Sequence, residues 1–411
     1  MSRNRFDLKR NFQKNSKSKA HANRRNPALH WDSALEDRRL MATLTLTATD
    51  DISYLAAPLF ANDLTVSIVG TDYVVQDNNL ADVMVLVDLS PNLNAVPLGG
   101  GLNGFSISTA ALTKNISVDT QDLDDIVRVQ DIAATTLLTS INTDLGLSDQ
   151  IIIGNPSGTL ATILSTVQMT DAAAGSVVIN DSSSLTAKTY TLDTVAGPLG
   201  QLTLSTQPTT ILQWANSFSG GITVDAGSAG NQFIVNNTLP SQTLNLNLGS
   251  ASDTTRVNGV GASAILNIDS QMGVPDQTTV GSIAVGVNNI LGAVNVVDSG
   301  GVGSLIVDDQ IHGVGRIWTL GAAGPVGSIS WGALPAQVTY GPGIIDVTLN
   351  AGTGLDTFTI NNTGGLASLV EVNGNTGVDS FNLNGASGPV RLNGDGDNDI
   401  FILNATGFRF C

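Results

Sequence analysis

A short phrase occurs three times between residues 350 and 403, and it limits what the chain can fold into. Each copy contains Asn or Ala with Gly, a loop, an Asp, and a Phe two positions after that Asp. The three pairs are Asp356 and Phe358, Asp379 and Phe381, and Asp399 and Phe401. The spacing of these pairs, a little over about 20 residues, suits one coil of a stacked β-structure.

The residues around each Phe alternate between apolar and polar. Phe358 and Ile360 point to one face of the expected strand, and Thr357 and Thr359 to the other, which is the period of a half-buried strand. One coil cannot bury its apolar face alone, so its neighbours must complete the core. We therefore predict an all-β fold, a parallel β-helix-like β-solenoid, with the Phe residues stacked inside it.

The phrase resembles the calcium-binding nonapeptide repeat G-G-x-G-x-D-x-U-x, in which U is a large apolar residue. The best copy runs from Gly374 to Asn382, and in the third copy Asp395 and Asp397 replace two glycines. In that family the Asp carboxylates and turn carbonyls share Ca²⁺, and oxygen ligands suit this cation. The resemblance implies calcium as a cofactor, with five candidate ligands: Asp356, Asp379, Asp395, Asp397 and Asp399.

The sequence departs from that family in its period. The family repeats its motif about every nine positions, whereas here the copies are more than twice as far apart, so at most one edge of the solenoid could carry ions. Without a counterion, aspartates in register repel one another. The alternative is that they are solvated turn residues that bond to their own backbone.

Acidic residues dominate the chain beyond its first 41 residues. Residues 1–41 hold 11 basic and 4 acidic residues, net +7, and the other 370 hold 7 basic and 31 acidic, net −24. Of the 35 acidic residues 33 are Asp, which favours turns over helices. Residues 42–411 are acidic enough to repel nucleic acid and anionic membranes, and we expect no nucleic-acid partner.

The basic N-terminal segment has two parts. Residues 1–30 lack periodicity and are predicted to be a disordered tail. In residues 31–42, Ser33 and Glu36 have capping-box spacing, which predicts a short helix. Leu35–Ala42 resembles the LEPR-XLL motif of very large bacterial surface and secreted repeat proteins, with Asp37 in place of its Pro. The resemblance implies a secreted or cell-surface location.

Residues 43–175 are predicted to be an irregular β-rich region, either a diverged copy of the repeat or a cap. Expected strands cover residues 43–49, 64–69, 73–75 and 83–87. A short helix is expected over residues 131–144.

A longer repeat is visible from Ser176 onward. Ser176–Asp181 matches Ser304–Asp309, and later matches keep the same order at a nearly constant offset. We predict two β-repeat modules, 176–303 and 304–411, the second truncated. In the first module the rung aspartate is expected to be lost, because Asn231 precedes Phe233. Tandem β-sandwich modules are the alternative architecture.

Motifs for chemistry are sparse. Cys411 is the only cysteine, and no apolar run approaches the ~20 residues of a membrane span, so we expect no transmembrane segment. Asp308 and Asp309 are adjacent acids, and paired carboxylates serve glycosidases. We predict a non-catalytic structural or adhesive repeat protein, with cell-envelope or extracellular polysaccharide or protein as partner. The alternative is a carbohydrate-active β-helix enzyme of the polysaccharide lyase or hydrolase type.

Overall fold

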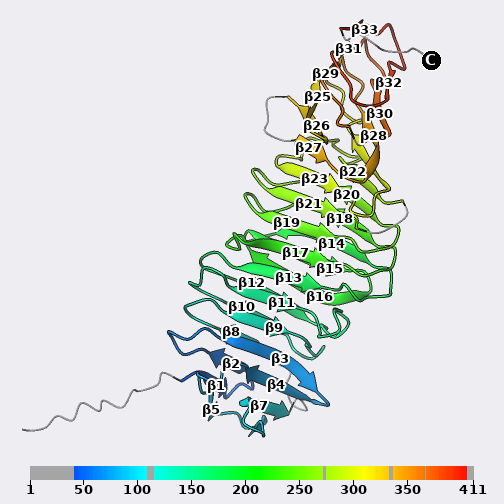
Figure 1. The fold of residues 1–411 in the computed structure, drawn as a ribbon. Helices are drawn as coiled ribbons and strands as arrows, with labels where there is room; N and C mark the ends of the chain where they lie inside the picture. Colours follow the sequence, from blue (N-terminus) through cyan, green and yellow to red (C-terminus); the bar gives the residue numbers. More distant parts are fainter. Residues whose placement is uncertain (1–40, 109–114, 272–274, 333–336, 366, 405–411) are drawn as a thin grey trace, which may run out of the picture. The chain divides into compact units, whose positions relative to one another are not determined.

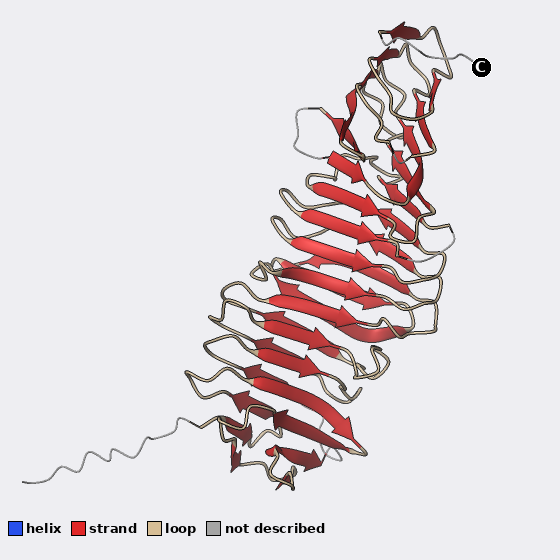
Figure 2. Ribbon diagram, viewed as in Figure 1, coloured by secondary structure: helices blue, strands red, loops and turns tan. Residues whose placement is uncertain are grey.

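The computed structural model describes residues 41–108, 115–271, 275–332, 337–365 and 367–404. These residues form strands and loops without any helix (Figure 2). They belong to one compact unit that begins at Leu40. The predicted tail of residues 1–30 and the LEPR-XLL-like segment, apart from its last two residues, lie outside the described residues.

Two long sheets of 16 and 17 strands make up the fold (Figure 1). The first sheet contains, in chain order, β1 (Thr43–Leu46), β2 (Ile52–Leu55), β5 (Val85–Asp88), β8 (Ile116–Asp119), β10 (Leu138–Asn142), β12 (Thr166–Thr170), β14 (Thr189–Val195), β15 (Leu199–Leu204), β16 (Gln207–Ala215), β18 (Gln232–Val235), β20 (Thr254–Val257), β22 (Gln277–Val280), β24 (Gly303–Asp308), β28 (Ile344–Asn350), β30 (Leu369–Asn373) and β32 (Val390–Asn393).

The second sheet contains β3 (Asp63–Val69), β4 (Asp72–Asp77), β6 (Ala95–Pro97), β7 (Asn103–Ser108), β9 (Ile126–Val129), β11 (Gln150–Ile153), β13 (Ser176–Asn180), β17 (Gly221–Asp225), β19 (Thr243–Asn247), β21 (Ile265–Asp269), β23 (Ala293–Val297), β25 (Ile317–Ala323), β26 (Val326–Trp331), β27 (Gln337–Tyr340), β29 (Thr357–Ile360), β31 (Ser380–Leu383) and β33 (Ile400–Leu403).

The chain passes from one sheet to the other and back, so one coil contains one strand of each sheet. From β18 to β22, each strand pairs in parallel with the strand one coil later, as in Gln232 with Thr254 and Thr254 with Gln277. The separation of these partners along the chain agrees with the expected period. Buried and partly exposed residues alternate along the strands, and the buried ones fill the space between the sheets. The predicted β-solenoid is therefore confirmed.

The three Phe residues of the repeated phrase are stacked on one another, and two of them lie in the core. Phe358 and Phe381 have ring centroids 4.6 Å apart, and Phe381 and Phe401 are 4.8 Å apart, with nearly parallel rings. The rings of Phe358 and Phe381 are fully buried, whereas Phe401 on β33 is 46% exposed. The in-register pairing of β29, β31 and β33 places one Phe directly beside the next.

Two antiparallel excursions interrupt the coils. In the first sheet β14, β15 and β16 form a meander, and in the second sheet β25, β26 and β27 form another. Tyr190 lies near the start of the first meander, and Trp318 holds the equivalent place in the second. The long sequence repeat therefore places equivalent strands on opposite sheets. The first module begins with β13 in the second sheet, and the second module begins with β24 in the first sheet. Between these two strands the chain crosses from one sheet to the other an odd number of times, so the second module starts half a coil out of phase with the first.

The two modules are not separate sandwiches. The expected boundary at 303/304 falls inside β24, which pairs in parallel with both β22 and β28. Each sheet continues through this point, so the tandem-sandwich alternative is wrong.

The region 43–175 contains both antiparallel strands and parallel coils. β3, β4, β7 and β6 are antiparallel neighbours, and the strands from β8 to β12 already form parallel coils. The expected strands are present, but the helix expected over 131–144 is wrong. β10 occupies part of it, with Ile141 buried, because its neighbours β8 and β12 supply backbone partners on both edges.

Candidate functional site

The most distinctive polar groups are Asp or Asn side chains that stand immediately before the first residue of a strand, and all of them except Asp399 are buried. They form three sets that follow the stacking direction, and we call these sets the aspartate columns. The first column contains Asn62, Asp125 and Asp149, the second Asn231, Asp253 and Asp276, and the third Asp356, Asp379 and Asp399.

The third column links coils through backbone-to-carboxylate hydrogen bonds. The N–H of Asp356 donates to Oδ1 of Asp379 at 2.8 Å, and the N–H of Asp379 donates to Oδ1 of Asp399 at 2.9 Å. The N–H of Arg316 donates in the same way to Oδ1 of Asp356 at 2.7 Å. Each aspartate thus accepts a hydrogen bond from a backbone N–H of the preceding coil and not from its own coil.

The other two columns repeat this arrangement. The N–H groups of Asn231 and Asp253 donate to Asp253 and Asp276, respectively. In the first column the N–H of Asp125 donates to Oδ1 of Asp149 at 2.8 Å. The expectation that the first module loses its rung aspartate therefore holds only at Asn231. Asp253 still accepts the backbone N–H of Asn231 in the preceding coil, although no Phe follows it.

The aspartates inside the columns are buried. Asp356 is 2% exposed and Asp379 and Asp253 are 0% exposed, so the interpretation of Asp356 and Asp379 as solvated turn residues is wrong, whereas Asp399 at the end of the third column is partly exposed. A Cβ on Gly374 would overlap Oδ2 of Asp379, which shows how closely the carboxyl packs against the preceding turn. Gly374, and likewise Gly394 beside Asp399, therefore makes room for the carboxyl that follows it in the same coil.

Burial raises the pKa of these carboxyls. The pKa of Asp379 rises from 3.8 to about 6, first because of burial and then because of the charges of Asp356 and Asp399. Burial likewise raises the pKa of Asp125 to about 6 and the pKa values of Asp149 and Asp253 to about 7. The pKa values of Asp149 and Asp253 therefore lie near neutral pH, whereas those of Asp125 and Asp379 lie below it, so the protonated fraction at neutral pH is larger for the first two.

Six of these carboxyls have one oxygen without a hydrogen-bond partner of ordinary geometry among the described residues. The six atoms are the Oδ2 atoms of Asp125, Asp149, Asp253, Asp276, Asp356 and Asp379. A buried unpaired oxygen is costly when it is charged, and a proton on it lowers that cost. The raised pKa values and the unpaired oxygens are thus two aspects of the same burial.

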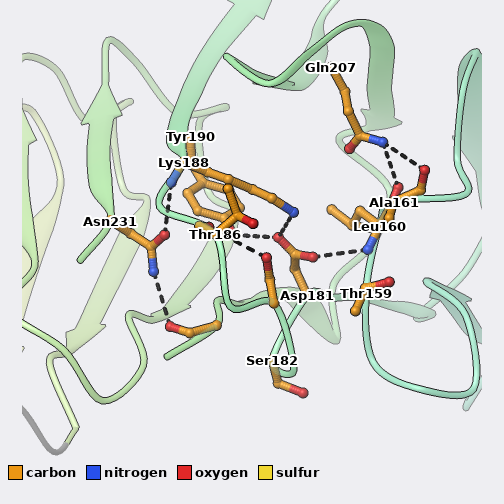
Figure 3. Close-up of polar contacts among 12 residues, drawn as sticks. Thr159, Leu160, Ala161, Asp181, Ser182, Thr186, Lys188, Tyr190, Gln207 and Asn231 are labelled. Carbon is orange, nitrogen blue, oxygen red and sulfur yellow. Dashed lines mark hydrogen bonds and ion pairs between the residues drawn. The ribbon is translucent and has the colours of Figure 1, made fainter. Parts of the chain in front are cut away.

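An ion pair with a fully buried aspartate lies at the start of each meander. Asp181 accepts hydrogen bonds on Oδ2 from Lys188 Nζ at 2.6 Å and from the Tyr190 hydroxyl at 2.5 Å (Figure 3). Its Oδ1 accepts the N–H of Leu160 at 2.9 Å. Both members of the pair are buried, with Asp181 at 0% and Lys188 at 8% exposed. The carboxylate is therefore fully engaged by this chain's own groups.

The second module contains the equivalent pair with Arg in place of Lys. Asp309 binds Arg316 Nε through Oδ2 at 2.6 Å and accepts the N–H of Val287 on Oδ1 at 3.0 Å. Lys188 and Arg316 also donate their backbone N–H groups to the first members of the second and third columns. Neither pair was predicted from the sequence, although Asp181 and Asp309, like Lys188 and Arg316, are separated by the offset of the long repeat.

The five calcium candidates fall into two groups. Asp356, Asp379 and Asp399 belong to the third column, whereas Asp395 and Asp397 are exposed turn residues. Asp397 Oδ2 accepts the N–H of Gly377 on the adjoining turn at 3.1 Å. In the parts of the chain that the structure describes, no group of three or more acidic, His or Cys side chains could hold a metal ion.

The adjacent acids Asp308 and Asp309 are not a matched pair. Asp309 is buried and held by Arg316, while Asp308 accepts the backbone N–H of Gln310 at 3.3 Å. The structure thus gives these two carboxyls different surroundings, and one of them does not face solvent.

Comparisons with protein-family models, with curated proteins and with solved structures find no match for this chain. Within the described ranges no helix is long and apolar enough to cross a membrane.

Proposed function

We propose that this chain is a non-catalytic structural or adhesive repeat protein of the bacterial cell surface or secreted fraction. The observation that carries the proposal is the use of the buried carboxyls. In every column they bind the backbone of a neighbouring coil, so their function is to hold the coils together. The acidic body and the LEPR-XLL-like segment support the location.

Calcium is part of the proposal only for the turns. A calcium ion takes 6–8 oxygen ligands, and the column carboxyls each have one oxygen occupied by a backbone N–H. The carboxyls of the columns are therefore better suited to carry a proton than to coordinate a calcium ion. The exposed turn that carries Asp395 and Asp397 is the remaining candidate.

Antibody labelling of intact cells tests the location. The proposal expects labelling without permeabilisation, and loss of the label after brief protease treatment of intact cells. Signal that appears only after lysis would contradict it. Hydrolysis or eliminative cleavage of acidic polysaccharides, lost in Asp308→Asn, would favour the carbohydrate-active enzyme instead.

A further inference from the structure

A groove lined mainly by polar residue types lies on the outer face of the second sheet. It spans β17, β19, β21 and β23, which are neighbours in that sheet (Figure 1). Its volume is about 440 Å³. The polar residues that line it are Thr223, Asn245, Asn247, Asn267, Asp269 and Asn295.

A continuous chain of side-chain hydrogen bonds runs along the floor of this groove. Asn295 Nδ2 donates to Asn267 Oδ1 at 2.8 Å, and Asn267 Nδ2 donates to Asn245 Oδ1 at 2.8 Å. Asn245 Nδ2 donates to Thr223 Oγ1 at 3.3 Å, which ends the chain. Because every amide donates in the same direction, the orientation of each amide is fixed by its neighbours.

This amide ladder leaves unused hydrogen-bonding capacity at regular intervals. A primary amide has two N–H donors and an oxygen with two lone pairs, and the ladder uses one donor and one lone pair of Asn267. Parallel strands repeat about every 4.8 Å, so the unused groups repeat at that spacing. A ligand that matches them must itself repeat, and it must carry both donors and acceptors.

The charge around the groove limits the ligand further. The residues that line it include no Lys, Arg or His, whereas Asp269 contributes a carboxylate. The body beyond residue 41 has a net charge of −24, so a polyanion would be repelled. Val297 adds an apolar surface at one side of the groove.

We propose that this groove binds a neutral, extended β-linked glycan that lies across the strands. Sugar hydroxyls both donate and accept hydrogen bonds, and each sugar of such a chain advances by a distance comparable to the strand spacing. The inference rests on the proposed adhesive function and specifies the class of partner.

Calorimetric titration of the full chain with cellohexaose tests the proposal, and polygalacturonate serves as the anionic comparison. We expect saturable binding of cellohexaose and none of polygalacturonate. Asn267→Ala removes the central amide and should weaken binding about three- to ten-fold, the effect of one or two hydrogen bonds.

Asn373→Ala is the matched control. Asn373 belongs to a separate amide ladder, where its Nδ2 donates to Asn350 Oδ1 at 2.8 Å on the first sheet. This variant should bind cellohexaose as the parent protein does, with a comparable change in melting temperature. Absence of saturable cellohexaose binding, preference for polygalacturonate, or equal weakening in both variants would overturn the inference. Surface labelling of cells without glycan binding would leave the proposed function standing and remove only this inference.

Discussion

The backbone N–H of Asp356 lies 2.8 Å from Oδ1 of Asp379, which belongs to the next coil along the chain. The same bond joins Asp379 to Asp399, so a turn residue in one coil supplies the acceptor that the preceding coil needs at the start of its strand. Since strand ends leave backbone N–H groups without ladder partners, a buried acceptor at this position stabilises the stack.

Replacement of Asp379 separates the role of the acceptor from that of the charge. Asp379→Ala should lower the free energy of unfolding by about 1–3 kcal/mol, because the N–H of Asp356 loses its partner inside the protein. Asp379→Asn keeps a carbonyl oxygen and should be much milder at neutral pH. Urea denaturation measures both, and equal losses would show that hydrogen bonding at this position is unimportant.

Stability should fall as the pH rises from about 5 to about 8. The folded-state pKa values of Asp379, Asp149 and Asp253 lie at about 6 to about 7, above the ordinary 3.8, so the folded state holds protons that the unfolded state has released. The stabilisation from these protons is complete below the unfolded pKa and is lost as the pH rises through the folded pKa. Thermal melting should show a decrease on the order of a few degrees. A melting temperature that rises over this range would contradict the columns as described.

Calcium should act mainly through the turn before β33. If Asp395 and Asp397 bind Ca²⁺, millimolar calcium at about pH 8 will raise the melting temperature, since a ligand that binds only the folded state stabilises it. Asp397→Asn should then abolish the increase. A melting temperature that does not respond to calcium would show that the folded protein does not bind the ion. An equal increase in Asp397→Asn would show that calcium binds at another site.

The aromatic stack predicts unequal costs for two similar substitutions. Phe381→Ala should lower the free energy of unfolding by about 3–5 kcal/mol, because Phe381 is fully buried between two rings. Phe401→Ala should cost clearly less, since that side chain is 46% exposed. Guanidinium denaturation compares the two variants, and equal costs would contradict the observed burial.

The ion pair at the first meander should tolerate exchange but not deletion. Lys188→Ala leaves Asp181 buried without its cation and should cost about 3–5 kcal/mol. Lys188→Arg should be close to the parent protein, because Arg316 fills the equivalent position. The pair of exposed Arg391 and partly buried Glu371 is the control, and Arg391→Ala should cost less than about 1 kcal/mol. Similar losses for Lys188→Ala and Arg391→Ala would show that burial does not matter.

The sequence was sufficient for the coil and its core. The alternation around Phe358 and the short period of the repeated phrase follow directly from side chains that face inward at every second position, and neighbouring copies of the phrase must then stack. The amide ladders and the meanders are less visible, because they depend on which strand becomes the neighbour of which.

The fate of the aspartates could not be read from the sequence. An Asp beside Gly in a turn is equally compatible with solvation, with calcium and with burial, and only the approach of Asp379 to the N–H of Asp356 distinguishes them. The switch of sheets between modules was also hidden. Trp318 lies on the second sheet because the chain crosses between the sheets an odd number of times after Tyr190. The number of residues between Tyr190 and Trp318 does not reveal how many times the chain crosses.

Disulfide formation between neighbouring coils tests the stacked register most directly. Thr359 and Asn382 are in-register partners on β29 and β31, and parallel neighbours at about 4.8 Å are within the range that a disulfide can span. In a Cys411→Ser background, the pair Thr359→Cys with Asn382→Cys should oxidise readily within one chain. The pair Thr357→Cys with Asn382→Cys is two positions out of register, beyond the ~7 Å limit, and should not. Equal oxidation of the two pairs, or none in the first, would contradict the stacked coils.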